Sequence, residues 1–329
     1  MLSFVAADPT PPVAAPAADP HAVAADPHAV TPGRLFAVRA GTAAGVLIPL
    51  AGVGLAGWLL WGRGFGWVEL LLLVGMYTAT AMSVTIGFHR LYTHRSFEAV
   101  APVRFLLGVF GSMAIQGPLI EWVSRHRRHH QHSDHPGDPH SPHEFGAGVW
   151  GVLRGFVHAH IGWAFTPDPP GGDRYVPDLR KSRLARVVSA LFPLWALLGV
   201  LLPAAVGGWA SGTWGGAAAG LVWGGLVRIF LVHHLTWSIN SVCHLWGSRP
   251  YETSDQSRNN AVFGVLAFGE GWHNNHHAAP RAASHGHKWY ELDLTYTAIR
   301  VFEKLGWATD VVPVKVASYK QTEATAPAA

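Results

Sequence analysis

The chain has 329 residues, of which 49% are hydrophobic and 13% are Asp, Glu, Lys or Arg. Soluble domains carry about 25% charged residues, so this composition excludes a purely water-soluble globule. The chain has a single cysteine, Cys243, which excludes a disulfide scaffold. We expect Cys243 to lie in the core. The net charge of +4 comes from a modest arginine excess, which in so apolar a chain indicates membrane orientation rather than nucleic-acid binding.

The N-terminal segment, residues 1–34, consists mainly of Ala, Pro, Asp, Val and His and contains ADPHAV twice. We expect a disordered tail, because the segment has few large apolar side chains that could form a core. It also lacks a basic start followed by an apolar run, so it is not interpreted as a secretory signal. A second flexible tail is expected over residues 313–329, which leaves 35–312 as one membrane domain.

Four apolar stretches are long enough to cross, as helices, a hydrocarbon layer about 30 Å thick. They cover residues 35–61, 67–88, 187–209 and 214–240. Short turns join the first to the second and the third to the fourth, so we expect two transmembrane hairpins. A fifth stretch, residues 103–120, is shorter and ends at a Gly-Pro pair, which favours a buried or interfacial helix.

Basic residues gather between the two expected hairpins. Residues 89–186 hold twelve Arg and Lys, whereas the two tight turns hold only Arg63. By the positive-inside rule, the long middle segment and both termini are therefore expected in the cytoplasm.

Histidine is unusually frequent, with 21 residues beside 20 acids, and eight histidines form three clusters on the expected cytoplasmic side. On an α-helix, positions i, i+3 and i+4 fall within an arc of roughly 100°, so an HxxHH sequence directs three imidazoles to one side. A spacing of five places two rings about 140° apart, so the first cluster can bind one metal only if its helix frays or bends. The clusters are His89 and His94; His126, His129 and His130; and His273, His276 and His277.

The histidine clusters indicate metal binding. Without a cation, so many packed imidazoles would leave buried donors and acceptors unpaired, at about 1–3 kcal/mol each. Imidazole suits Fe, Zn, Cu and Ni, and the lack of cysteine and the near lack of carboxylates within the clusters argue against Fe–S, Mg and Ca sites. Eight histidines exceed the ligands of one octahedral metal, so we expect two metals, more naturally redox iron than structural zinc. Three further histidines, His158, His160 and His234, are expected to be hydrogen-bonded polar residues.

The clusters, their order and their position beside two hairpins resemble those of the membrane fatty acyl desaturases of the stearoyl-CoA delta-9 type. The resemblance covers about residues 35–312. It implies an all-α integral membrane protein, in which four transmembrane helices in two hairpins support a helical cytoplasmic cap with a histidine-ligated di-metal site. The stretches that carry it are GFHRLYTHRSF, EWVSRHRRHHQHSDHPGDPHSP, TWSINSVCHLWGSRPY and GEGWHNNHH.

The resemblance also implies two iron ions and their ligands. Asn240 and His244 lie four residues apart, hence on one helix face, and Asn240 would reach its iron through a water. His233 shares this face. It either supports a metal ligand without contacting the metal or is a hydrogen-bonded polar residue of the core. The implied ligands are His89, His94, His126, His130 and His277 for one iron, and His129, His244, His273 and His276 for the other.

Substrate residues follow from the same resemblance. Gln116, Trp122 and Thr236 match residues that bend the family's acyl tunnel at the metals, which implies a cis double bond at carbon nine of a C16–C18 chain. Coenzyme A is the expected carrier and phospholipid the alternative. The Arg-Lys pair that contacts CoA phosphates in the animal enzymes is missing here, so Arg125 and Lys181 are expected to replace it.

The implied reaction consumes O2 and two electrons. A separate donor of the ferredoxin, cytochrome or flavin reductase type is expected, because the chain has no Gly-rich dinucleotide fingerprint, no CxxC cluster and no cytochrome b5 domain. The His-Pro-Gly-Asp sequence at 135–138 resembles the haem signature of that domain and is interpreted as chance.

Two alternatives to a desaturase stay open. A membrane di-iron hydroxylase or ketolase shares the clusters and would leave an oxygen function in its product. A histidine-rich transporter or haem-binding membrane protein is a third hypothesis, although a transporter should carry more polar residues within its spans.

Overall fold

The computed structural model describes residues 31–63, 65–168 and 171–315. Most of the two predicted tails, residues 1–34 and 313–329, therefore lies outside the described residues. The first helix begins at Pro32, three residues before the predicted span, with the ring of proline at the first helical position, where its missing N–H costs nothing.

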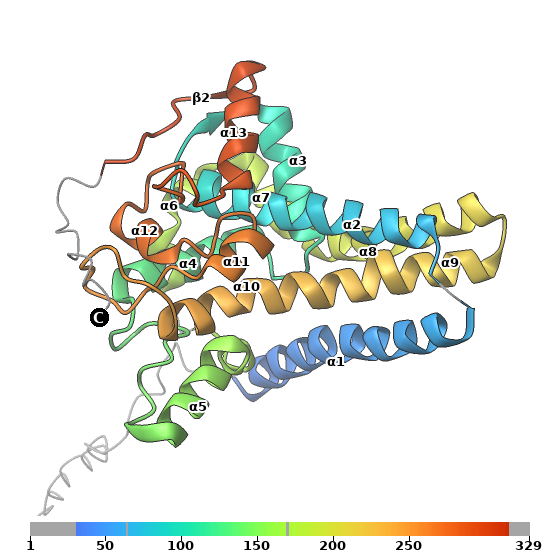
Figure 1. Ribbon diagram of the computed structural model, residues 1–329, viewed down its shortest axis with the longest axis horizontal. Coiled ribbons are helices and arrows are strands. Elements are labelled where there is room, and N and C mark those ends of the chain that lie inside the picture. Colours follow the sequence, from blue (N-terminus) through green and yellow to red (C-terminus); the bar gives the residue numbers. More distant parts are fainter. Residues whose placement is uncertain (1–30, 64, 169–170, 316–329) are drawn as a thin grey trace, which may run out of the picture.

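The described residues are mainly helical, with one two-stranded antiparallel sheet in which Glu98 pairs with Thr309 (Figure 1). The long helices run side by side, and the shorter elements gather at one end of them. The elements are α1 (Pro32–Arg63), α2 (Trp67–Met82), η1 (Ser83–Thr93), β1 (Glu98–Ala99), α3 (Ala101–Ser112), α4 (Leu119–His132), α5 (Gly148–His160), η2 (Gly162–Phe165), η3 (Gly172–Tyr175), α6 (Pro177–Lys181), α7 (Arg183–Ala190), α8 (Phe192–Ser211), α9 (Trp214–Gly220), η4 (Leu221–Val227), α10 (Arg228–Leu245), α11 (Ala261–Leu266), α12 (His273–Ala278), α13 (Leu294–Lys304) and β2 (Ala308–Thr309).

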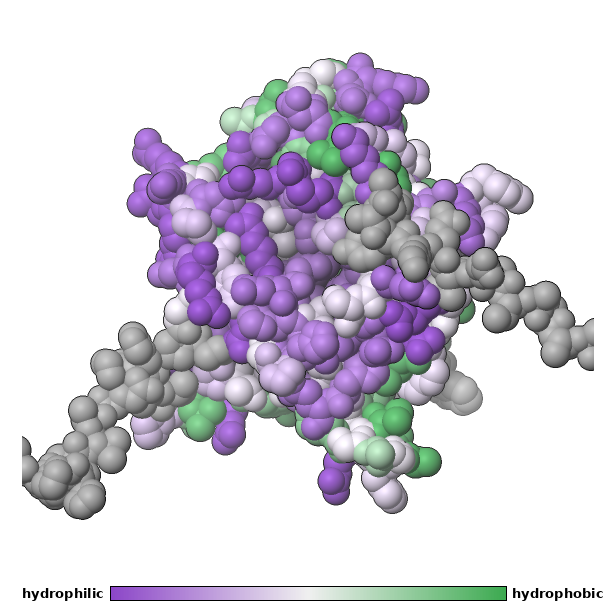
Figure 2. All heavy atoms as spheres, turned by 90° about the vertical axis from the view of Figure 1, so that its left-hand side faces the viewer, coloured by the Kyte–Doolittle hydropathy of each residue, from purple (hydrophilic) through white to green (hydrophobic). Residues whose placement is uncertain are grey.

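Four continuous helical stretches are long and apolar enough to cross a membrane, as predicted: Pro32–Leu60, Trp67–Thr93, Phe192–Ser211 and Trp214–Leu245. Their outward side chains include large apolar groups, among them Trp58, Leu71 and Trp214 at 70%, 69% and 93% exposure. Water would not favour such a surface, whereas lipid would cover it. Figure 2 views the molecule from the end where the shorter elements gather, and this face is mainly hydrophilic.

The largest differences from the predicted spans lie at three boundaries. The third span begins at Phe192 rather than at 187, because the amphipathic helix α7 ends at Ala190 and Pro193 starts a new helix. The second and fourth spans continue to Thr93 and Leu245. These extensions carry histidines of the expected metal site beyond the predicted apolar stretches.

The fifth apolar stretch is interrupted, as its Gly-Pro pair suggested. Helix α3 ends at Ser112, a turn with positive φ at Ile115 and Gly117 follows, and α4 begins at Leu119. A helix of this length is too short to cross the bilayer.

Buried contacts join the long helices to the shorter elements. The Arg228 guanidinium is fully buried and donates to the carbonyls of Met113, Gly199 and Gly224 at 2.6, 2.5 and 3.1 Å. It thereby links α10 to the end of α3 and to α8. Cys243 is buried, as expected.

Candidate metal centre

The first histidine pair lies at the end of a π-helix, η1, that continues α2: His89 is in its last turns and His94 caps its C-terminus. Hydrogen bonds in a π-helix join residues five apart, and the His94 amide donates to the His89 carbonyl at 3.1 Å. The two ring centroids lie 4.8 Å apart. The separation of about 140° expected for an α-helix is therefore absent, because the extra residue per turn brings both imidazoles to one side.

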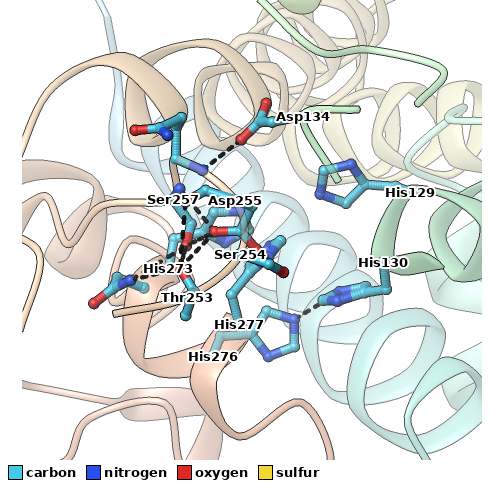
Figure 3. Close-up of polar contacts among 12 residues, drawn as sticks. His129, His130, Asp134, Thr253, Ser254, Asp255, Ser257, His273, His276 and His277 are labelled. Carbon is cyan, nitrogen blue, oxygen red and sulfur yellow. Dashed lines mark hydrogen bonds and ion pairs between the residues drawn. The ribbon is translucent and has the colours of Figure 1, made fainter. Parts of the chain in front are cut away.

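All nine histidines implied by the resemblance converge in two groups. Within each group, one potential ligand atom per residue lies within 4.8 Å of every other. Helices η1, α4, α10 and α12 and the residue that caps η1 supply them, and Figure 3 shows His130 directed toward His276. The first group comprises His89, His94, His126, His130 and His276, and the second comprises His129, His244, His273 and His277.

The expected allocation of the last cluster was wrong. His276 belongs to the first group, with its Nε2 atom 3.2 Å from Nε2 of His89 and 3.0 Å from Nε2 of His130. His277 belongs to the second group, because it lies one helical turn after His273 on the same face of α12, with ring centroids 4.4 Å apart.

Buried carboxylates orient four of these histidines through Nδ1. A carboxylate at Nδ1 fixes the proton there and leaves the Nε2 lone pair facing the other rings, which is the usual arrangement behind metal-binding histidines. The pairs are His89 with Glu270 at 2.5 Å, His129 with Asp138 at 3.0 Å, His244 with Asp134 at 2.8 Å and His277 with Asp255 at 2.6 Å.

None of the four carboxylates was predicted from the sequence as a partner of a histidine. Asp134 and Asp138 follow the second cluster closely in the sequence. Asp138 is the last residue of the His-Pro-Gly-Asp sequence, and its carboxylate orients His129. Asp255 accepts from Thr253 and Ser257 at 2.8 and 2.6 Å (Figure 3), and no spacing to a histidine marks it in the sequence.

Burial and neighbouring charges favour the protonation states that bind metal, which are ionised carboxylates and neutral imidazoles. Burial alone raises the pKa of Asp138, but His129 and the His140 backbone N–H bring that pKa well below its usual range. Burial, followed by neighbouring histidines, lowers the pKa values of His126, His130 and His276 far below 6.5. The carboxylates are therefore ionised and these imidazoles neutral near pH 7.

The residues fit two cations. Buried Nε2 atoms of His94, His129 and His277 have no hydrogen-bond partner among the described residues, and such orphaned acceptors are costly unless a ligand meets them. Sets of five and four imidazole nitrogens suit first-row transition metals such as iron and not Mg or Ca.

The other predicted polar residues have ordinary partners. His233 Nε2 donates to the carbonyls of Ala114 and Ile115 at 2.9 and 3.0 Å, which favours the hydrogen-bonded alternative for this residue. His160 and His234 bond to each other at 2.9 Å.

A cavity, called here the first cavity, reaches the histidines. His89, His126 and His273 line it, together with Asn240 and the three predicted tunnel residues. Gln116 Nε2 donates to Thr236 Oγ1 at 2.9 Å, and Trp122 Nε1 donates to Gln116 Oε1 at 3.2 Å. The structure thus joins the three tunnel residues in one hydrogen-bonded wall beside the metal groups.

The two expected phosphate contacts are not brought together. Arg125 binds Asp168 through two hydrogen bonds of 2.9 and 2.5 Å and lies over the Trp163 ring at 4.9 Å. Lys181 is exposed at the end of α6 and does not line the first cavity. Arg125 is therefore already paired with a carboxylate.

Comparisons with known proteins agree with the site. Residues 65–310 match the family model described as fatty acid desaturase. The chain is 41% identical over 280 residues to hex-5-enoyl-[acyl-carrier protein] acetylenase of Moorena producens, covering 84% of this chain and 86% of the relative. It is 38% identical over 260 residues to sn-1 stearoyl-lipid 9-desaturase of Anabaena variabilis, covering 78% and 88%. It is also 38% identical over 250 residues to icosanoyl-CoA 5-desaturase of Limnanthes douglasii, covering 74% and 64%.

Proposed function

This chain belongs to the fatty acid desaturase family, and from that premise we propose that it inserts a cis double bond at carbon nine of a saturated C16–C18 acyl chain. The reaction uses O2 at two iron ions held by the two histidine groups. A saturated acyl chain, O2, two electrons and two protons give a cis-monoene and two waters. The observation that supports this most is that one cavity passes both the histidine groups and the wall formed by Gln116, Trp122 and Thr236.

The chemistry needs a strong oxidant, because the methylenes that lose hydrogen have no acidifying neighbour. Bound iron, once reduced, supplies the activation of O2 and the removal of two hydrogens. The protein supplies position. Trp122, Gln116 and Thr236 are joined by hydrogen bonds, and in this proposal they would hold a bend in the bound acyl chain. One pair of carbons would then lie next to the histidines in an eclipsed conformation that gives the cis product.

Orientation in the membrane is part of the proposal. The excess of Arg and Lys in residues 89–186 supports a cytoplasmic location for the histidine groups and both termini, with the four spans as two hairpins. The hydrophilic face in Figure 2 would then meet water and a separate electron donor. That donor is of the ferredoxin, cytochrome or flavin reductase type.

The test is expression in a host that lacks delta-9 desaturation, followed by mass spectrometry of the fatty acids. We expect new cis-9 monoenes, and none from a His129→Ala protein that accumulates equally. A hydroxylated product would instead identify the hydroxylase alternative. A double bond at another carbon would refute the assignment of position while leaving desaturation intact.

A further inference from the structure

A second cavity adjoins the first one. The two share Gln116, Arg125, Trp163 and Trp237 in their walls. Many residues that line the first cavity are apolar, among them Ala81, Val84 and Phe268, so it suits the methyl end of an acyl chain. The carboxyl end and its carrier then lie in the second cavity, which carries charged groups.

The charges of the second cavity cancel. It is lined by three arginines and three carboxylates, and two of the arginines are already in ion pairs. Arg125 binds Asp168, and Arg180 binds Asp173. The six charged residues are Arg34, Arg125, Arg180, Glu121, Asp168 and Asp173.

Such a cavity is poorly suited to coenzyme A. That carrier presents a diphosphate and a third phosphate, and phosphate sites in proteins use cations that are free to form charge-assisted hydrogen bonds. To bind it here, Arg125 and Arg180 would have to leave Asp168 and Asp173, and these two carboxylates would then face the phosphates with like charge.

The second cavity also extends along a membrane span. Residues 37, 38, 41, 42, 45 and 46 of α1 line it, and so does Phe192 at the start of α8. At Gly41 and Gly45 a Cβ would meet no atom within 4 Å, so the α1 face is open there. Thr42 donates to the Ala164 carbonyl at 2.7 Å, which fixes α1 against the loop that carries Trp163. A bilayer lipid could therefore reach the charged part along α1 without leaving the membrane.

We propose that the acyl carrier is a bilayer glycerolipid with an uncharged or zwitterionic headgroup, and that Asp168 and Asp173 exclude polyphosphate carriers by neutralising Arg125 and Arg180. This inference rests on the proposed desaturase function and replaces coenzyme A, the carrier expected from the sequence. A glycerolipid needs no cluster of free cations, and its ester-linked chain enters the first cavity past Gln116 and Trp237.

The first experiment compares carriers directly. The iron-loaded enzyme, in phosphatidylcholine vesicles with a reducing donor system, receives either phosphatidylcholine with a labelled stearoyl chain or labelled stearoyl-CoA. Mass spectrometry of intact lipids and thioesters then locates the product. We expect conversion of the phosphatidylcholine and at least tenfold less conversion of stearoyl-CoA. Equal or preferential conversion of stearoyl-CoA would overturn the carrier inference but leave the desaturase function standing, whereas no conversion of either substrate, together with no new monoene in the expression host, would refute the function itself.

The second experiment measures the role of the two carboxylates. Asp168→Asn combined with Asp173→Asn frees both arginines, so binding of stearoyl-CoA to the vesicle-embedded enzyme should tighten by at least about tenfold, as expected for new charged hydrogen bonds. The matched control, Glu98→Gln combined with Asp310→Asn, removes two charges outside both cavities and should leave the dissociation constant within about twofold. Unchanged stearoyl-CoA binding in the first double variant, or an equal gain in the control, would overturn the proposed role.

Discussion

Replacing Asp138 by asparagine tests whether buried carboxylates set the metal affinity. The Asp138 side chain is fully buried and accepts from His129 Nδ1 with both oxygens at 3.0 Å, as well as from the backbone N–H groups of Asp134 and His140 at 2.9 and 3.0 Å. Asparagine has nearly the same size, but one of its two terminal atoms is a donor. Whichever way the amide turns, its NH2 group faces a backbone N–H, and the negative charge behind His129 is lost.

The expected loss follows from this geometry. Removing a carboxylate behind a metal-binding histidine weakens metal affinity by about 10–100-fold, which equals about 1.4–2.8 kcal/mol. A charged hydrogen bond contributes about 1.5–3 kcal/mol, which agrees. Since His129 belongs to the second group alone, the Asp138→Asn protein should lose one iron and keep the other.

The assay is iron content per chain after dialysis against increasing chelator. At a chelator concentration where the wild type keeps both irons, Asp138→Asn should retain about one, with half-loss at about 10–100-fold less chelator. Asp255→Asn, which disturbs His277 of the same group, should behave alike, and Asp310→Asn at an exposed carboxylate should match the wild type. Identical iron retention in Asp138→Asn, Asp255→Asn and the wild type would refute the reasoning.

Three further outcomes are expected. His244→Ala should abolish desaturation and remove the iron of the second group although His244 lies outside the three clusters, while His158→Ala should stay active; normal product from a well-expressed His244→Ala protein would contradict the nine-histidine assignment. Trp122→Ala or Thr236→Ala should widen the bend and spread the double bond over neighbouring carbons, as seen by mass spectrometry of derivatised products, and an unchanged single position would count against the tunnel wall. Arg228→Met should leave buried carbonyls unpaired at a cost of about 3 kcal/mol, or about 6–12 °C in Tm, in a thermal unfolding assay; an unaltered Tm would show that the three carbonyl contacts contribute little.

Hydropathy was sufficient to find the four spans but not their ends. Continuous apolar runs make each span visible without any tertiary information. The start of the third span was misplaced because residues 187–191 are apolar enough to extend it, although α7 and α8 are separate helices. Amphipathic helices that lie beside a span share its apolar residues, so hydropathy cannot separate the two.

Residue spacing indicated that each HxxHH cluster directs its histidines to one side, and it required a departure from α-helical geometry for His89 and His94 to meet. His126 and His130 lie one turn apart on α4 and share a group, as spacing requires. His89 and His94 share that group only because η1 is a π-helix, and nothing in the residue pattern distinguishes a π-helical turn from an α-helical one.

Long-range ion pairs explain most of what the sequence could not show. Arg125 was expected to meet phosphate because it is a cation near the site, but Asp168, 43 residues later in the chain, occupies it. Glu270 likewise lies 180 residues after Arg90, its partner. Pairings of this length depend on the tertiary fold, so counting charges along the chain overestimates the cations available to a ligand.

The Glu270 pairing also connects the metal groups to α13. Glu270 joins Nδ1 of His89 to the Arg90 guanidinium, and the same guanidinium binds Asp293 at 2.9 Å. Asp293 in turn caps α13 through the Tyr296 amide at 2.8 Å. A metal ligand on the second span is thus connected, through buried charges only, to a helix more than 200 residues later. Because breaking a buried ion pair costs more than its formation gains, an error in docking α13 would leave Arg90 and Glu270 without part of their partners and would thereby disturb the orientation of His89.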